Sequence, residues 1–141
     1  MSVSGKNVVV TGAAGFIGAH LVRTLSAAGA FVTGIDNERS GDWARIGDGT
    51  CRRIVADFAA CDEAELRDAC RGADVVFHLA AEKYNSSKST PQKVIDVNVS
   101  GTQRLVDTCV AEGVGHLVFT SSLYAYGSMG PEAMAETDLL M

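Results

Sequence analysis

The sequence predicts an α/β protein built on a doubly wound parallel sheet, and three features of the chain point to this class. Short apolar runs alternate with segments in which apolar residues recur at helical spacing. A glycine-rich turn, residues 11–18, directly follows the first apolar run. A lone carboxylate, Asp36, ends the second run. Strands that alternate with helices form a parallel sheet through right-handed crossovers, with helices on both faces and therefore three layers.

Five strands and three main helices follow from this alternation. The expected helices begin after the glycine turn, at the capping-box pattern of Asp62 to Glu65, and at Thr90 with Pro91 in the first helical position. A ligand at a topological switch point implies the strand order 3-2-1-4-5, which is a Rossmann-type arrangement, and we assign residues 1–141 to one such domain. The expected strands are residues 6–11, 31–35, 53–56, 75–79 and 116–120.

Apolar spacing predicts which side of each helix packs on the sheet. The polar loop after the second strand offers Trp43 and Ile46 as packing anchors. Asn98 lies at the edge of the stripe of the long helix, so its amide is either a structural clamp or a ligand contact. The stripe of the first helix, which Gly29 ends, consists of Ile17, Leu21, Leu25 and Ala28. The stripe of the long helix, which runs to about residue 112, consists of Ile95, Val99, Thr102, Leu105, Val106 and Cys109.

The glycine-rich turn is a candidate phosphate site. Gly12, Gly15 and Gly18 follow the spacing G-x-x-G-x-x-G between a strand and a helix. Such glycines allow a tight turn, close approach of a ligand to the backbone and close packing of helix on strand. The free N–H groups of the first helical turn and the helix dipole favour a diphosphate there. The alternative is a turn that binds no ligand, because three spaced glycines alone are a weak signal in a glycine-rich chain.

Asp36 is the candidate ribose-binding residue. A carboxylate at the end of the second strand lies where the adenosine ribose of a dinucleotide would fall. It accepts hydrogen bonds from both ribose hydroxyls and repels a 2′-phosphate, so we expect NAD to be preferred over NADP. Arg39 lies close in sequence and weakens this preference. The alternative is that Asp36 only starts a turn with Asn37.

The composition argues against several other classes of function. A net charge of −5 and the lack of a basic cluster argue against a nucleic-acid partner. No apolar run reaches membrane-spanning length and residues 1–6 hold no apolar signal core, so we expect no membrane association. The four cysteines, at 51, 61, 70 and 109, follow neither a zinc nor a disulfide pattern. We therefore expect reduced thiols, a cytoplasmic location and no metal site.

Six motifs occur in an order that resembles a known family. They are residues 11–18, 36–37, 57–58, 78–81, 98–102 and 121–127. On these motifs the chain resembles the extended short-chain dehydrogenase/reductases, which include NAD-dependent epimerases and dehydratases of nucleotide sugars. The resemblance implies that Phe16 and Ile17 cover the diphosphate, that Asp57 and Phe58 flank the adenine, and that residues 79–81 line the nicotinamide side. The full set implied for the cofactor is Gly12, Gly15, Phe16, Ile17, Gly18, Asp36, Asn37, Asp57, Phe58, Leu79, Ala80, Ala81, Lys83 and Asn98.

The resemblance also implies a catalytic role for Ser122. This residue lies four positions before Tyr126 in the family pattern S-S-x-x-x-Y-G, where the serine hydrogen-bonds the reacting sugar hydroxyl. The alternative is that Ser121 and Ser122 only end a strand. The family's proton acceptor is a tyrosine in a Y-x-x-x-K pair further along the chain. The sequence stops at Met141, before that position, so we expect this chain alone to be inactive.

A second Y-x-x-x-K pattern, from Tyr84 to Lys88, lies between the fourth strand and the long helix. It is serine-rich, so we expect a loop without the one-turn helical spacing that brings two such side chains together. It also precedes Ser122, whereas in the family the pair follows the serine. We therefore expect this pattern to have no catalytic role.

Two functions from different classes follow. The first is the cofactor-binding part of an NAD-dependent epimerase or dehydratase. It would act on a UDP- or dTDP-linked sugar by transient hydride transfer to bound NAD, as a homodimer. The second is a non-catalytic dinucleotide-binding module. A ketone reductase of the same family is a third option.

Overall fold

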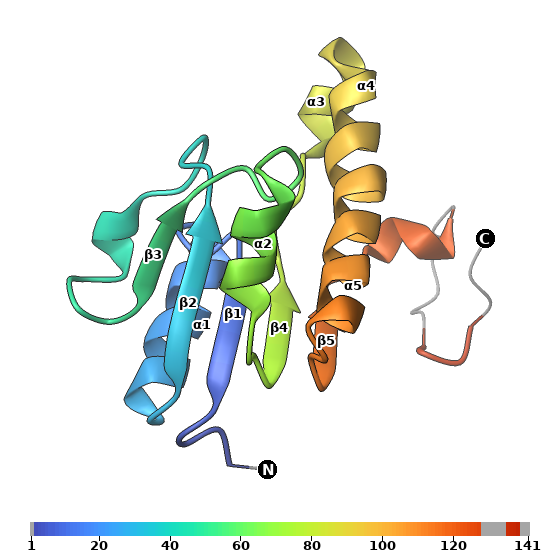
Figure 1. The fold of residues 1–141 in the computed structure, drawn as a ribbon. Coiled ribbons are helices and arrows are strands. Elements are labelled where there is room, and N and C mark those ends of the chain that lie inside the picture. Colours follow the sequence, from blue (N-terminus) through green and yellow to red (C-terminus); the bar gives the residue numbers. More distant parts are fainter. Residues whose placement is uncertain (1, 128–134, 139–141) are drawn as a thin grey trace.

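The computed structural model describes residues 2–127 and 135–138, and five parallel strands form its sheet (Figure 1). The strand order is β3-β2-β1-β4-β5, which confirms the predicted fold class and order. The strands are β1 (Asn7–Thr11), β2 (Phe31–Asp36), β3 (Arg52–Val55), β4 (Val75–His78) and β5 (His116–Phe119). The helices are α1 (Phe16–Ala27), α2 (Glu63–Cys70), α3 (Tyr84–Ser89), α4 (Pro91–Ile95) and α5 (Thr102–Ala111).

The central strand β1 is buried on both faces of the sheet. Val8 and Val10 pack in the core on one face, whereas Val9 packs in the core on the other. In register, Val9 lies opposite Thr33 of β2 and Val76 of β4. A strand covered on both faces needs a continuous apolar run, which explains the three consecutive valines.

The helices complete three layers around this sheet. α1 covers one face, where Val22 and Leu25 pack with the buried loop residue Trp43. α2 and α5 cover the other face, where Leu66 and Leu105 are almost fully buried. Figure 1 shows α2 in front of the sheet and α1 behind it. The predicted three-layer α/β/α arrangement is therefore confirmed.

The loop after β2 and the start of α2 gave one correct prediction and one wrong prediction. Trp43 and Ile46 are both buried, as expected, and Trp43 begins a short 3₁₀ turn capped by Asp42. The capping box predicted at Asp62 is not formed, because the Asp62 side chain makes no hydrogen bond to the helix. Acidic residues in the first turn, Glu63 among them, still complement the helix dipole.

The predicted stripe of α1 was wrong at both ends. Ile17 is 65% exposed and Ala28 is also exposed. Leu25 is buried and Leu21 is partly buried, as predicted, and the other buried residues of the helix are Gly18, Ala19 and Val22. The physical reason is the glycine turn: α1 packs against it through Gly18, which rotates Ile17 toward the carboxyl end of the sheet.

The long helix is not a regular α-helix, and its predicted stripe was wrong in the first half. α4 and α5 are joined by a π-helical segment, Asp96–Gly101, whose wider turn shifts the register. Ile95 and Val99 are exposed, while Val97, Leu105 and Cys109 are buried. α4 also projects beyond the carboxyl ends of the strands, so it has no sheet to pack on (Figure 1). Neither this helix nor any other within residues 2–127 and 135–138 is long and apolar enough to cross a membrane.

Candidate cofactor and active site

The glycine turn between β1 and α1 forms one wall of a cavity at the carboxyl ends of the strands. Gly12 has a left-handed backbone with φ of 69°, and a Cβ there would lie 2.9 Å from the amide nitrogen of Ala80. A Cβ on Gly18 would lie 2.0 Å from the carbonyl oxygen of Gly12, so α1 can pack on the turn only without a side chain at this position. Gly15, Phe16 and Ile17 also line the cavity. The turn therefore brings the N-terminus of α1 to the cavity.

Asp36, at the end of β2, lines the cavity and is only 8% exposed. Its Oδ2 accepts the N–H of Ala14 at 3.0 Å, and its Oδ1 accepts the N–H of Glu38 at 2.8 Å. The second bond is the turn-forming contact that the sequence offered as the alternative. Each carboxylate oxygen has two lone pairs, so both can still accept a ribose hydroxyl. Asp36 thus holds its own loop and keeps the capacity to bind a ligand.

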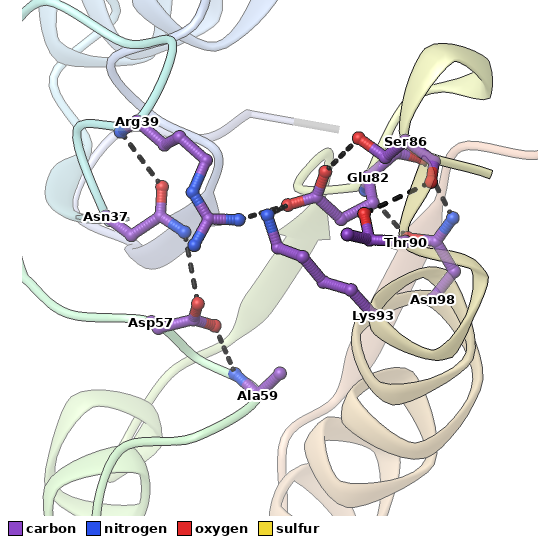
Figure 2. Close-up of polar contacts among 9 residues, drawn as sticks. All are labelled: Asn37, Arg39, Asp57, Ala59, Glu82, Ser86, Thr90, Lys93 and Asn98. Carbon is purple, nitrogen blue, oxygen red and sulfur yellow. Dashed lines mark hydrogen bonds and ion pairs between the residues drawn. The ribbon is translucent and has the colours of Figure 1, made fainter. Parts of the chain in front are cut away.

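The opposite wall is built where β3 ends. Asn37 Nδ2 donates to Asp57 Oδ2 at 3.2 Å, which ties the loop after β2 to the loop after β3. Asp57 Oδ1 accepts the N–H of Ala59 at 3.1 Å. Figure 2 shows Asp57 in contact with both partners. Phe58 is buried and lies edge-on to the His78 ring, with the centroids 4.9 Å apart. Asn37, Asp57 and Phe58 all line the cavity, and the place of Asp57 and Phe58 beside the adenine stays a prediction.

His78 ends β4 and is a buried structural group. Its Nδ1 lies 2.7 Å from Thr11 Oγ1, and its Nε2 lies 3.0 Å from Thr102 Oγ1. Thr11 Oγ1 also accepts the N–H of Ala80, so the Thr11 hydroxyl can donate to Nδ1 while the Nε2–H donates to Thr102. Burial lowers the pKa of His78 to about 4. At neutral pH the ring is therefore uncharged and connects β1, β4 and α5.

After β4 the chain forms part of the cavity wall, and hydrogen bonds with Asn98 hold its backbone in position. Leu79, Ala80 and Ala81 line the cavity, and their contact with the nicotinamide side of a cofactor stays a prediction. Asn98 Oδ1 accepts the N–H of Glu82 at 2.8 Å, and Asn98 Nδ2 donates to the Glu82 carbonyl at 3.0 Å (Figure 2). Of the two roles that the sequence left open for Asn98, the structure shows the clamp. Asn98 is not among the cavity-lining residues, so its contact with a cofactor stays a prediction.

Charged residues that the sequence prediction did not include also border the cavity. They are Glu82, Lys93 and Arg45, and Arg39 and the predicted Lys83 line the cavity as well. Arg39 was noted only for its effect on cofactor choice. Glu82 pairs with Arg39 and with Lys93, which come from the β2 loop and from α4. The one feature of the sequence that could have pointed to Glu82 is its position as a single acidic residue directly after the apolar run that contains β4.

Ser122 follows β5 at the same end of the sheet but does not line the cavity. It is exposed, and its Oγ accepts the N–H of Tyr124 at 3.3 Å, which caps the short 3₁₀ helix Leu123–Tyr126. This is the structural role that the sequence offered as the alternative. The hydroxyl can still donate its proton, so a contact with a substrate hydroxyl stays a prediction.

The segment from Tyr84 to Lys88 was expected to be a loop, and this was wrong. It forms the helix α3, so positions 84 and 88 lie one helical turn apart. A short helix forms here because the loop after β4 is anchored through Glu82, to which Ser86 donates at 2.8 Å. The order of this segment before Ser122 in the chain is then the remaining argument against a catalytic role.

The cavity has the size and the groups that a dinucleotide needs. Its volume is about 650 Å³, within the usual range for cofactor sites. The N-terminus of α1 lines it, and helix N-termini favour anions such as a diphosphate; the buried carboxylate of Asp36 also lines it, and a carboxylate can accept hydrogen bonds from ribose hydroxyls. A side chain at Gly12 or Gly18 would displace the turn itself. The fold and the site therefore define a dinucleotide-binding α/β protein.

The chain belongs to the NAD dependent epimerase/dehydratase family, whose model matches residues 8–140. Cinnamoyl-CoA reductase 1 of Petunia hybrida is 33% identical over 140 residues, which covers 96% of this chain and 40% of that protein. A solved UDP-N-acetylglucosamine 4-epimerase from Methanobrevibacter ruminantium M1, in complex with UDP-N-acetylmuramic acid, is 30% identical with a TM-score of 0.87. That match covers 98% of this chain and 44% of the epimerase chain.

A UDP-glucose-4-epimerase from Stenotrophomonas maltophila, solved with bound NAD and formylated UDP-arabinopyranose, is 31% identical with a TM-score of 0.86. That match covers 96% of this chain and 43% of the epimerase chain. The chain thus spans 40% to 44% of the length of these three relatives. The predicted family and the predicted cofactor, NAD, are confirmed.

Proposed function

We propose that this chain is the cofactor-binding domain of an NAD-dependent epimerase or dehydratase that acts on a UDP- or dTDP-linked sugar. The observation that carries the proposal is the cavity at the carboxyl ends of the strands, where the glycine turn meets the buried carboxylate of Asp36. The solved relatives with nucleotide-sugar ligands, which match nearly the whole chain, support the substrate class. A cytoplasmic homodimer remains part of the proposal.

Each wall of the cavity has its own part in holding the cofactor. The N-terminus of α1 binds the diphosphate, and Phe16 and Ile17 cover it. Asp36 accepts hydrogen bonds from the adenosine ribose. Asp57 and Phe58 flank the adenine. When bound, NAD supplies a reversible hydride acceptor next to the sugar. The remaining contacts are assigned to Asn37, Leu79, Ala80, Ala81, Lys83 and Asn98.

Ser122 orients the substrate in this proposal. A serine hydroxyl is too weak a base to take a proton at neutral pH, but it hydrogen-bonds well to another hydroxyl. Ser122 therefore fixes the position of the reacting sugar hydroxyl. The group that takes the proton is the tyrosine of the Y-x-x-x-K pair that the family resemblance implies.

A ketone reductase is the second candidate, because a 3beta-hydroxysteroid-dehydrogenase/decarboxylase of Arabidopsis thaliana is 37% identical over 81% of this chain and 22% of that protein, and a hydroxysteroid dehydrogenase interconverts an alcohol and a ketone. Both candidates share the cofactor site and differ in what lies above the nicotinamide. A non-catalytic module that only binds NAD is the third.

The test uses the protein that carries this sequence, expressed from its natural reading frame and loaded with NAD. Incubation with UDP- and dTDP-hexoses, followed by NMR of the sugar protons, is expected to show a changed sugar. Ser122→Ala should lower kcat by about a hundredfold. Ser121→Ala is the matched control and should leave kcat close to that of the wild type. Reduction of ketones without any change in the sugars would favour the second candidate, and NAD binding without any turnover would favour the third.

A further inference from the structure

Glu82 is the centre of a charged network at the cavity. Its side chain is only 13% exposed. Its Oε1 pairs with Arg39 Nη1 and lies 2.5 Å from Lys93 Nζ, while its Oε2 accepts the Ser86 hydroxyl at 2.8 Å. Figure 2 shows the three partners converging on this one carboxylate from the β2 loop, from α3 and from α4. The Asn98 clamp holds the Glu82 backbone from which this carboxylate extends.

Arg39 is the cation of the loop that carries the ribose-binding residue. It follows Asp36 by three positions and lines the same cavity. Its backbone N–H is held by Asn37 Oδ1 at 3.1 Å, so the start of the side chain is fixed relative to Asp36. The guanidinium reaches toward the β4 side of the cavity, where Glu82 binds it (Figure 2).

A 2′-phosphate on the adenosine ribose needs a cationic partner, and Arg is the side chain best suited to bind one. In this cavity a 2′-phosphate would have to compete for Arg39 with a carboxylate that is already fixed and largely buried. It would also lie next to the negative charge of Asp36. NAD, which lacks this phosphate, meets neither obstacle.

We propose that Glu82 is a specificity-determining residue: by holding Arg39, it denies NADP a partner for the 2′-phosphate and so favours NAD. The inference rests on the proposed placement of the adenosine ribose at Asp36. The selectivity is then set by two residues from different loops. Asp36 repels the 2′-phosphate, and Glu82 forms the ion pair that keeps Arg39 from binding it.

The test is the ratio of the dissociation constants for NAD and NADP, measured by calorimetry on the purified chain and on the Glu82→Gln variant. Glutamine keeps the shape, the Asn98 clamp on the backbone and a hydrogen bond to Ser86, but removes the charge that holds Arg39. We expect the ratio to shift toward NADP by at least about fivefold, because a freed guanidinium can make a charge-assisted bond to the phosphate. The shift should vanish in the double variant Arg39→Gln/Glu82→Gln.

Two control variants separate the effect of Arg39 from that of Lys93, the other cation that pairs with Glu82. Lys93→Gln leaves Glu82 in place to hold Arg39, so it should not move the ratio toward NADP. Arg39→Gln in the wild-type background should leave NADP affinity unchanged, and this arm does not depend on the folding of the Glu82 variant. The inference is overturned by an unchanged ratio in a folded Glu82→Gln variant. It is also overturned by a shift that persists in the double variant, or by loss of NADP binding in Arg39→Gln alone. Failure of the wild type to bind NAD would instead overturn the proposed site itself.

Discussion

Acidification to pH 5 should destabilise the folded chain through His78. The pKa of this histidine is about 4 in the folded state against an ordinary value of 6.5, because the ring is buried. Between these two values the unfolded chain binds a proton that the folded chain does not, so stability is complete above pH 6.5 and falls as the pH drops toward 4. From pH 8 to pH 5 the free energy of unfolding should decrease by about 2 kcal/mol. Hydrogen bonds from Arg52 and Lys6 lower the pKa values of Asp68 and Asp74 from their ordinary value, so the contribution of these carboxylates is lost mainly at lower pH.

Urea unfolding followed by fluorescence of Trp43, the single tryptophan, measures this effect directly. A loss of about 2 kcal/mol corresponds to a midpoint about 1 M lower in urea at pH 5 than at pH 8. The His78→Asn variant should be less stable at pH 8 and should lose most of the pH dependence in this window. NMR titration of the His78 ring in the wild type gives the folded pKa independently of any variant. A ring that titrates near 6.5, or a midpoint that does not change with pH, would refute the reasoning.

Four further outcomes are expected. The wild-type chain should bind NAD more tightly than NADP, and Asp36→Asn should weaken NAD binding about tenfold in calorimetry; equal or tighter NADP binding by the wild type would show that Arg39 governs the site. Gly18→Ala should destabilise the chain by about 1–3 kcal/mol and abolish measurable NAD binding, because the new Cβ meets the Gly12 carbonyl; Gly72→Ala adds a Cβ with no atom within 4 Å but at a left-handed φ of 70°, so it should also lose stability yet keep NAD binding. The chain alone should bind NAD without epimerase, dehydratase or dehydrogenase activity in coupled assays; turnover that Tyr84→Phe removes would contradict this. The chain should self-associate with rising concentration in light scattering, because β5 is an edge strand of the described sheet with Val118 and Phe119 exposed, and a clean monomer would count against an accessible edge.

The sequence by itself determined the layers, the strand order and the glycine turn between β1 and α1, because each depends on a local pattern. The consecutive valines of β1 can be buried only in a strand covered on both faces. The glycines of the turn and Asp36 lie at fixed distances from the strands that carry them, so their place at the carboxyl edge follows once the order of elements is known. Element ends were off by about one residue where backbone pairing, rather than composition, sets the boundary.

Only the tertiary structure decided which side of each helix is buried and how the charged groups of the cavity are paired. Ile17 points outward because Gly18 must pack directly against Gly12. The π-helical segment before α5 moves Val99 to the surface. The spacing of apolar residues alone contains neither constraint. Glu82 and Arg39 lie 43 positions apart in the chain. They meet because β2 and β4 end at the same edge of a parallel sheet, on either side of β1. Ion pairs of this kind depend on how loops converge in space, so no local pattern in the sequence could predict them.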